Sequence, residues 1–218
     1  MRIRIDLKIF IFIVLFYLTK QIEIYAMLMI FAILHECGHL IAGLIMGFKP
    51  EKINIMPMGL SIAFKIPVEN YNKKVDKSNI LSVKKIIIAF AGPIINIIIA
   101  LIVTFINFNF TEVQRLNIVY ANIIICIFNL LPIYPLDGGR ILKQFIKIKE
   151  GIANSLKYTH MIQNISIIFL TFVSSIAIYY LENISILIII IYLWILVINE
   201  NKKYAIKRRI YNCIKENT

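Results

Sequence analysis

The chain has 218 residues, of which 60% are hydrophobic and 17% are charged, and its formal net charge is +12. Soluble domains contain about 45–50% apolar and about 25% charged residues, so this composition excludes an ordinary soluble globule. A disordered chain needs low hydrophobicity, and a disulfide scaffold needs many more than 3 cysteines. We therefore expect one polytopic membrane domain over residues 1–218, because several spanning helices leave little chain for a soluble module.

Six apolar runs predict six membrane-spanning helices, and hence an all-α membrane protein built as a six-helix bundle. A hydrocarbon core about 30 Å thick needs roughly 20 residues per helix, and the first and last runs are shorter than this. The runs cover residues 9–18, 24–46, 86–106, 118–134, 161–181 and 184–198.

The basic residues predict the orientation of this bundle. Of the 24 Lys and Arg, 22 lie in four segments that six spans would place on one face: residues 1–8, 48–85, 138–160 and 199–218. Only Lys20 and Arg115 lie on the other face. Cytoplasmic loops are enriched in Lys and Arg, so we expect both termini in the cytoplasm of a bacterial cell. The same pattern explains the net charge by topology and argues against nucleic acid as a partner.

The second and third runs are joined by a segment with a strand pattern. Residues 51–66 read EKINIMPMGLSIAFKI, with partial alternation, β-branched residues and a Pro-Met-Gly turn signal. This pattern predicts a short β-hairpin. The polar, Lys-rich residues 67–85 are expected to form a solvated cytoplasmic loop.

The second apolar run contains the sequence His35-Glu36-Cys37-Gly38-His39 near its middle. Two histidines four residues apart share one face of a helix and can hold one Zn²⁺ ion, while Glu36 is placed to act on a water at the metal. Three such polar residues in hydrocarbon are costly unless they are paired or bound to metal. The alternative is that they only satisfy one another inside the bundle.

A catalytic zinc site usually has three protein ligands, and Asp137 is the best-placed third one. It follows Pro132 and Pro135, which break the fourth run, and precedes Gly138 and Gly139, which allow a close turn. Non-helical backbone at membrane depth is tolerated where it is buried in protein or lines a watery cavity. A helix end with a polar cap is the alternative interpretation, and His160 is the rival ligand.

Three motifs occur in order: HECGH at residues 35–39, AGPIIN at 91–96 and NLLPIYPLDGG at 129–139. Together they resemble the site-2 protease family of intramembrane zinc metalloproteases (peptidase M50), over roughly residues 30–145. The resemblance implies that His35, His39 and Asp137 bind zinc and that Glu36 is the catalytic base. It also implies that Asn129 lies near the active site and either orients the substrate or stabilises the oxyanion. Within AGPIIN, Gly92 and Asn96 are expected either to let the third span pack closely or to line the cavity, and a small-residue packing contact is the favoured interpretation.

The compact arrangement most resembles the sporulation branch of that family, the stage IV sporulation protease FB, with a catalytic core over residues 24–145. That branch implies cleavage of a pro-sigma factor, pro-sigma-K, in the membrane around the forespore, with regulatory membrane proteins as further partners. We expect neither a PDZ nor a CBS domain. The alternatives are a site-2 protease acting on anti-sigma factors, a zinc-binding transporter, or a catalytically silent scaffold. A transporter has no special use for a Glu directly after the first His, and usually shows paired, repeated halves.

Overall fold

The structure is a computed structural model that describes residues 2–5, 7–18, 20, 22–56, 59–65, 75–106, 110–181 and 185–216. It divides into two compact units, Met1–Asn129 and Leu130–Thr218.

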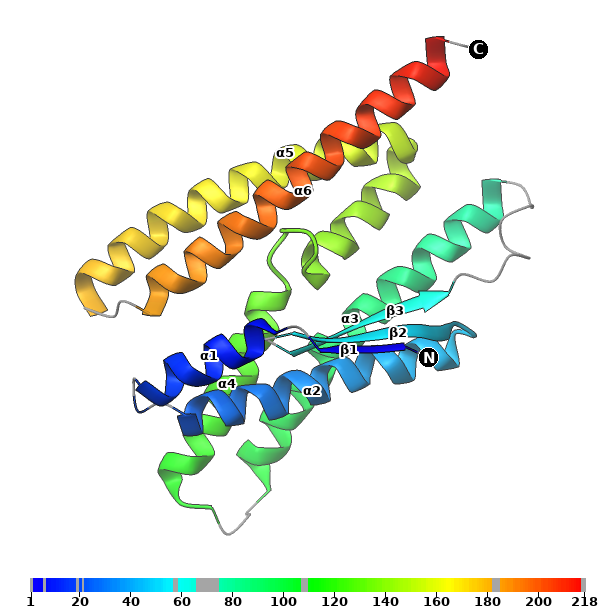
Figure 1. Cartoon of the computed structure of the whole chain (residues 1–218). Helices are drawn as coiled ribbons and strands as arrows, with labels where there is room; N and C mark the ends of the chain where they lie inside the picture. Colours follow the sequence, from blue (N-terminus) through cyan, green and yellow to red (C-terminus); the bar gives the residue numbers. More distant parts are fainter. Residues whose placement is uncertain are drawn as a thin grey trace. The chain divides into compact units, whose positions relative to one another are not determined.

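Six helices account for most of the described chain, and each predicted apolar run overlaps one of them (Figure 1). Three of the helices are long and apolar enough to cross a membrane: residues Ile22–Ile45, Asn79–Phe105 and Asp137–Tyr180. The predicted six spans are therefore not confirmed within the described residues. The helices are α1 (Lys8–Leu18), α2 (Ile22–Ile45), α3 (Val75–Phe105), α4 (Glu112–Asn129), α5 (Asp137–Leu181) and α6 (Ser185–Glu216).

The helices that do not qualify as spans share a simple physical limitation. α1 has only 11 residues, and α4 has 18 residues and begins with Glu112. A helix needs roughly 20 apolar residues to cross the hydrocarbon core. In α6 the uncharged stretch ends at Glu200, after which the helix becomes strongly basic.

One predicted loop and the predicted end of one span need correction. α3 begins at Val75, so residues 75–85 of the expected solvated loop are helical, and residues 66–74 lie outside the described residues. α4 ends at Asn129, five residues before the predicted end of the fourth run, because the segment that follows contains Pro132 and Pro135. α5 begins at Asp137 and includes the basic stretch 138–160, with a non-helical break at Gly151, whose positive φ favours glycine (φ 83°, ψ 179°).

The predicted hairpin is confirmed as two antiparallel strands, β2 (Lys49–Met56) and β3 (Gly59–Lys65). Their register pairs Lys49 with Lys65 and Met56 with Gly59, and it shifts after Pro50, which cannot donate to a ladder. The turn residues 57 and 58 lie outside the described residues. A third strand that was not predicted, β1 (Arg2–Ile5), pairs with β2 in parallel, so the order is β1-β2-β3.

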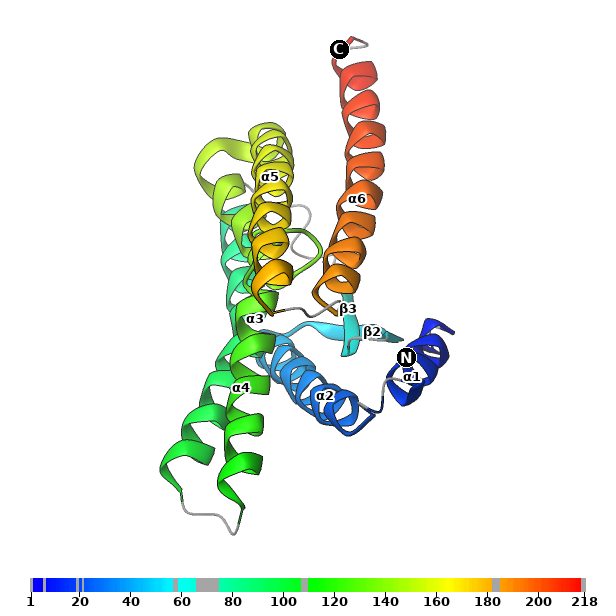
Figure 2. The ribbon, with the colours of Figure 1, turned by 90° about the vertical axis from the view of Figure 1, so that its left-hand side faces the viewer.

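In the first unit, α3 packs against both α2 and α4 (Figures 1 and 2). Small residues permit the close approach of α2: a Cβ added at Gly38 would meet the Ala91 carbonyl oxygen of α3 at 2.8 Å. A Cβ at Gly43 would collide with the ring of Phe64, so β3 lies equally close to α2. The two histidines of α2 therefore face a tightly packed α3.

In the second unit, α5 and α6 run side by side in opposite directions (Figure 1). Polar side chains join them at several levels. Trp194 donates its Nε1–H to Thr171 Oγ1 at 3.0 Å, and Asn201 donates to Asn164 Oδ1 at 3.1 Å.

Candidate metal centre

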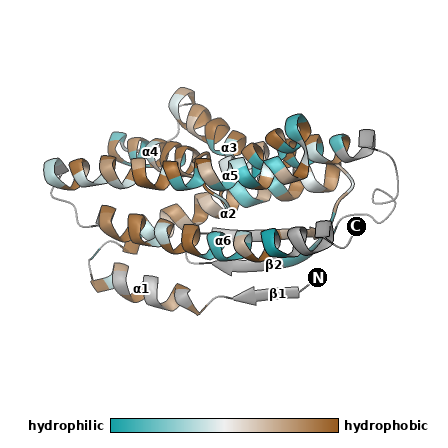
Figure 3. Cartoon of the chain, turned by 90° about the horizontal axis from the view of Figure 1, so that it is seen from above, coloured by the Kyte–Doolittle hydropathy of each residue, from teal (hydrophilic) through white to brown (hydrophobic). Residues whose placement is uncertain are grey.

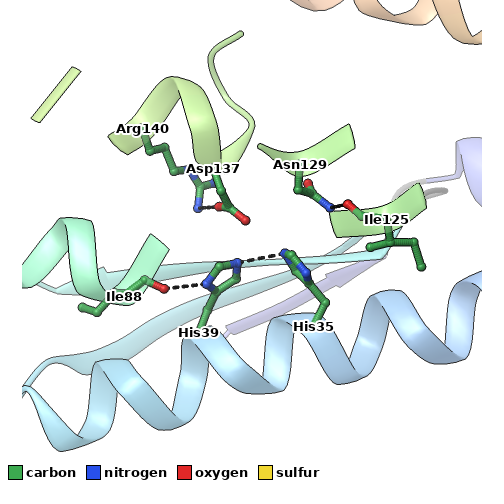
Figure 4. Close-up of polar contacts among 7 residues, drawn as sticks. All are labelled: His35, His39, Ile88, Ile125, Asn129, Asp137 and Arg140. Atoms are coloured by element: carbon green, nitrogen blue, oxygen red, sulfur yellow. Dashed lines mark hydrogen bonds and ion pairs between the residues drawn. The ribbon is translucent and has the colours of Figure 1, made fainter. Parts of the chain in front are cut away.

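The two histidines of the HExxH motif face each other on α2 (Figure 4). Their Nε2 atoms are 3.1 Å apart, and the rings meet edge to face with an interplanar angle of 86°. Both side chains are buried, at 2% and 3% exposure. The spacing of four residues predicts this shared face, and the structure confirms it.

Contacts with α3 determine which imidazole nitrogens of His35 and His39 are available to bind a metal ion. His39 Nδ1 lies 2.7 Å from the Ile88 carbonyl oxygen, which can only accept, so His39 carries its proton on Nδ1. His35 Nδ1 lies 3.2 Å from Asn96 Oδ1 and donates in the same way. In a neutral imidazole with a protonated Nδ1, Nε2 holds a lone pair. Both rings therefore direct an electron pair toward the same place.

Two nitrogen lone pairs at this separation repel each other unless a proton or a metal ion lies between them. Two imidazoles on one tetrahedral zinc, with Zn–N of about 2.0–2.1 Å, would place their nitrogens roughly 3.3 Å apart. The separation of 3.1 Å is close to that value. Metal-binding histidines usually donate their other ring N–H to a carbonyl or similar acceptor, as both do here. The histidine pair fits a zinc ion.

Gly92 keeps the space beside both nitrogens open. A Cβ added at this position on α3 would lie 2.5 Å from His35 Nε2 and 2.5 Å from His39 Nε2. Any side chain larger than hydrogen would fill the place where the two lone pairs converge. Pro93 follows directly and lies inside the helix, where it removes one backbone hydrogen bond and loosens the preceding turn.

Glu36 lies on α2 between the two histidines in sequence and is half-buried. It is one residue after His35 and three before His39, which puts it on the edge of the same helix face. A carboxylate at this position can exchange a proton with a water near the histidine nitrogens.

Asn129 is the last residue of α4, and its Nδ2 donates to the Ile125 carbonyl oxygen at 3.0 Å (Figure 4). This bond fixes the amide against its own helix. The amide nitrogen has two hydrogens, so a second N–H is available in addition to this bond.

In the second unit, Asp137 is the first residue of α5. It was expected at the end of the fourth run, and the structure instead places it at a helix start after an irregular segment. The carboxylate makes an ion pair of 3.6 Å with Arg140, one turn further on (Figure 4). A helix N-terminus also favours a negatively charged side chain at this position.

The segment before Asp137 folds back against the first turn of α5. A Cβ at Gly138 would lie 2.0 Å from the Leu130 carbonyl oxygen, and one at Gly139 would lie 2.4 Å from the Tyr134 nitrogen. Only glycine fits at these two positions, as the close turn predicted from the sequence requires. The Tyr134 N–H also donates to Gln163 Oε1 at 3.2 Å, which ties the segment to the middle of α5.

The rival ligand His160 is engaged elsewhere in the second unit. Its ring stacks on Tyr204 of α6, with a centroid distance of 4.2 Å and an angle of 19°. Among the described residues it belongs to no group of three His, Cys, Asp or Glu side chains able to hold a metal.

The sequence model of peptidase family M50 matches residues 23–116 and 116–173, well over half of the chain. The chain belongs to peptidase family M50. The matched residues include the histidine pair, Glu36, Asn129 and Asp137. Family membership and the histidine geometry thus indicate the same kind of centre, a zinc site.

This M50 chain is 29% identical over 140 residues to a zinc metalloprotease of Methanocaldococcus jannaschii. The match takes in 62% of this chain and 37% of the relative, so it spans little more than a third of that protein's length. Among solved structures, the chain is similar to the site-2 protease from Methanocaldococcus jannaschii, with a TM-score of 0.64 at 22% identity. That likeness covers 91% of this chain and 89% of the other, and it shows a common fold.

Sequence reasoning missed the roles of two residues in this M50 chain. A packing contact was favoured for Gly92 and Asn96 over a place in the cavity wall, whereas Gly92 lies against both histidine Nε2 atoms and Asn96 accepts a hydrogen bond from His35. A fully buried asparagine inside an apolar run is a usable signal, because a buried amide needs a polar partner. The sequence could not show that the partner is His35, since the contact joins residues 61 positions apart.

Proposed function

We propose that this chain is an intramembrane zinc endopeptidase that cleaves a membrane-associated or transmembrane protein. The observation that carries the proposal is the pair of His35 and His39 Nε2 lone pairs, 3.1 Å apart and held from behind by α3. Membership of peptidase family M50 and three helices able to cross a membrane support it.

Asp137 is the proposed third ligand. Asp137 would add one carboxylate ligand to the two imidazole ligands of the histidines. Catalytic zinc sites use such a set of three ligands and keep a fourth position open. Its place at the start of α5 and its glycine-supported turn are features of a positioned side chain rather than a frayed helix end.

When bound, zinc supplies Lewis acidity that polarises the scissile carbonyl and makes water acidic enough to attack near neutral pH. Glu36 is the proposed general base. It accepts a proton from the attacking water and returns it to the nitrogen of the leaving amine, so the protein ends the cycle unchanged. Asn129 is proposed to donate its second amide N–H to the substrate, either to orient it or to stabilise the developing oxyanion.

The sheet offers a way to hold an extended substrate. Within the described part of the chain, β2 is flanked by β1 and β3, so the two outer strands have an edge that can accept another strand. We propose that a substrate segment adds to the edge of β3, whose Phe64 packs on the metal-binding helix at Gly43. A proline scan of residues 59–65 should reduce cleavage at alternate positions, where the edge N–H groups point outward.

The proposed substrate is a pro-sigma factor, pro-sigma-K, with both termini of the enzyme in the cytoplasm. The resemblance of the compact arrangement to the sporulation branch supports the substrate, and the distribution of basic residues supports the orientation of the termini. Co-expression with tagged sigma-factor precursors and with anti-sigma factors, comparing the native chain with Glu36→Gln, tests it. A shortened precursor that appears only with the native chain is expected. Cleavage of anti-sigma factors alone would overturn the proposed substrate, while the proposed zinc protease mechanism would stand.

Metal analysis together with cleavage of a tethered peptide tests the activity itself. A protease contains zinc and cuts the peptide, and it loses cleavage in Glu36→Gln. A transporter or silent scaffold would contain zinc and leave the peptide intact in both forms.

A further inference from the structure

The second unit contains a small cavity between α5 and α6 that the proposed catalysis does not use. Thr159, His160 and Gln163 line it from α5, and Glu200 and Lys203 are among its residues on α6. Its volume is about 40 Å³, whereas a single ordered water needs roughly 10–15 Å³ on the same measure. The space inside the cavity therefore suits one compact polar group.

The walls of the cavity supply donors and positive charge. Lys143 lines it with its Nζ 4.9 Å from the centre of the Tyr134 ring, and Tyr134 is itself a lining residue. Lys203, whose side chain is 62% exposed, forms an ion pair with Glu200 at the rim of the cavity. An ammonium has three N–H donors, so Lys203 can serve Glu200 and a second acceptor together. The buried Thr159 hydroxyl donates its hydrogen bond to the Ser155 carbonyl oxygen, at 2.6 Å.

The cavity lies where both helices change from an uncharged, apolar sequence to a basic one. Residues 161–181 of α5 and 185–199 of α6 contain no charged side chain, whereas 138–160 carry five and 199–218 carry six basic residues. Figure 3 shows this change from apolar to polar along α6. The lining residues fall at the transition on both helices, which is the level of lipid headgroups when the apolar parts lie in hydrocarbon.

We propose that this cavity binds the phosphate group of an anionic phospholipid, held by Lys143 and Lys203. Basic pockets between helices at the cytoplasmic face are suited to lipid headgroups. The acyl chains would then lie along the apolar surface of α5 and α6. Because Tyr134 lines the cavity and Asp137 follows three residues later, the bound lipid would touch the segment that carries the proposed ligand.

The single tryptophan provides a probe of this site in the full-length chain. Trp194 lies six residues before Glu200 on α6, and therefore roughly 9 Å below it in the direction of the hydrocarbon. Lipids with brominated acyl chains quench tryptophan fluorescence on contact. Reconstitution into mixtures of brominated phosphatidylglycerol and phosphatidylcholine gives the relative affinity for the anionic lipid, with no need for proteolytic activity.

We expect the native chain to prefer phosphatidylglycerol, and Lys143→Gln and Lys203→Gln each to lower that preference by about fivefold. Glu200→Gln, which removes the competing negative charge, should raise it. Lys202→Gln is the matched control, since Lys202 is an exposed neighbour that does not line the cavity. It should leave the preference within about twofold of the native value.

Equal quenching by the two lipids in the native chain would overturn the proposal, as would an equal effect of Lys202→Gln and Lys203→Gln. Addition of inorganic phosphate or ATP distinguishes a soluble source of the same chemistry. If either abolishes the lipid preference at millimolar concentration, the site belongs to a soluble phosphate and the lipid assignment fails. Because the readout is fluorescence, loss of peptide cleavage in the same preparations would bear on the proposed protease activity alone.

Discussion

His35 Nδ1 lies 3.2 Å from Asn96 Oδ1, and this contact determines which nitrogen of His35 is left to bind a metal. The Nδ2 of Asn96 is buried and has no hydrogen-bond partner among the described residues. The side-chain oxygen of Asn96 therefore holds the His35 ring, and its side-chain nitrogen has no part in this contact.

Replacement of Asn96 should separate these two atoms. Asn96→Leu removes the acceptor and should weaken zinc binding by about 10–100-fold, the usual effect of losing a partner behind a metal ligand. Asn96→Asp keeps an oxygen acceptor facing His35 and replaces the unpartnered NH2 group with a second, negatively charged oxygen. A carboxylate behind a zinc-binding histidine is a common arrangement, so the zinc affinity should stay at or above the native value. Competition with a calibrated chelator measures both. Equal losses in the two variants would contradict the assigned role.

Gly92→Ala should abolish zinc binding, because the new methyl group would lie 2.5 Å from both Nε2 atoms. We expect affinity to fall by more than about 100-fold, beyond the loss of a supporting contact. Gly43→Ala is the control, since it also adds a methyl at a crowded glycine but meets Phe64 of the sheet. That variant should keep its zinc. Retention of zinc in Gly92→Ala would show that the ion does not lie between these two nitrogens.

Gln163 is a positioning residue for the segment before Asp137, since its Oε1 accepts the Tyr134 N–H at 3.2 Å. Gln163→Leu leaves that N–H without its partner, which costs about 1–3 kcal/mol of stability. If Asp137 is a ligand, the variant should also lose zinc faster to a chelator and cleave more slowly. Asn164→Leu, one step further along the same polar network, is the comparison. A drop in stability alone, with native zinc retention, would make Gln163 purely structural.

The sequence predicted the parts of this centre that depend on local periodicity. His35 and His39 share a face because a helix repeats every 3.6 residues, and the hairpin follows from alternation around a turn signal. The four-residue strand β1 was missed, because so short a segment acquires its structure from pairing with β2. The contacts of Asn96 and Gly92 depend on how α2 packs against α3, which local pattern does not encode.

The position of Asp137 shows the same limit. Pro132 and Pro135 predicted a helix break, and the break is there, but nothing local showed whether Asp137 would end one helix or begin the next. The close contacts at Gly138 and Gly139 are what fold the segment back onto α5.

Metal removal should abolish cleavage reversibly. Dialysis against a chelator is expected to remove activity, and one equivalent of Zn²⁺ should restore it, whereas Mg²⁺ should not, because imidazole nitrogens suit zinc and magnesium prefers oxygen ligands. Activity that persists in a preparation shown to be free of metal would exclude the proposed chemistry.

The proposed zinc chemistry is tested by measuring zinc content and cleavage of a tethered substrate together, in the native chain and in Glu36→Gln, His35→Ala and Asp137→Ala. Loss of a catalytic proton acceptor should lower the rate by about 10²–10⁴-fold, so Glu36→Gln should hold one zinc per chain and show no product on the normal time scale. His35→Ala and Asp137→Ala should lose both zinc and cleavage. Normal cleavage by Glu36→Gln, or full zinc occupancy in Asp137→Ala, would contradict it.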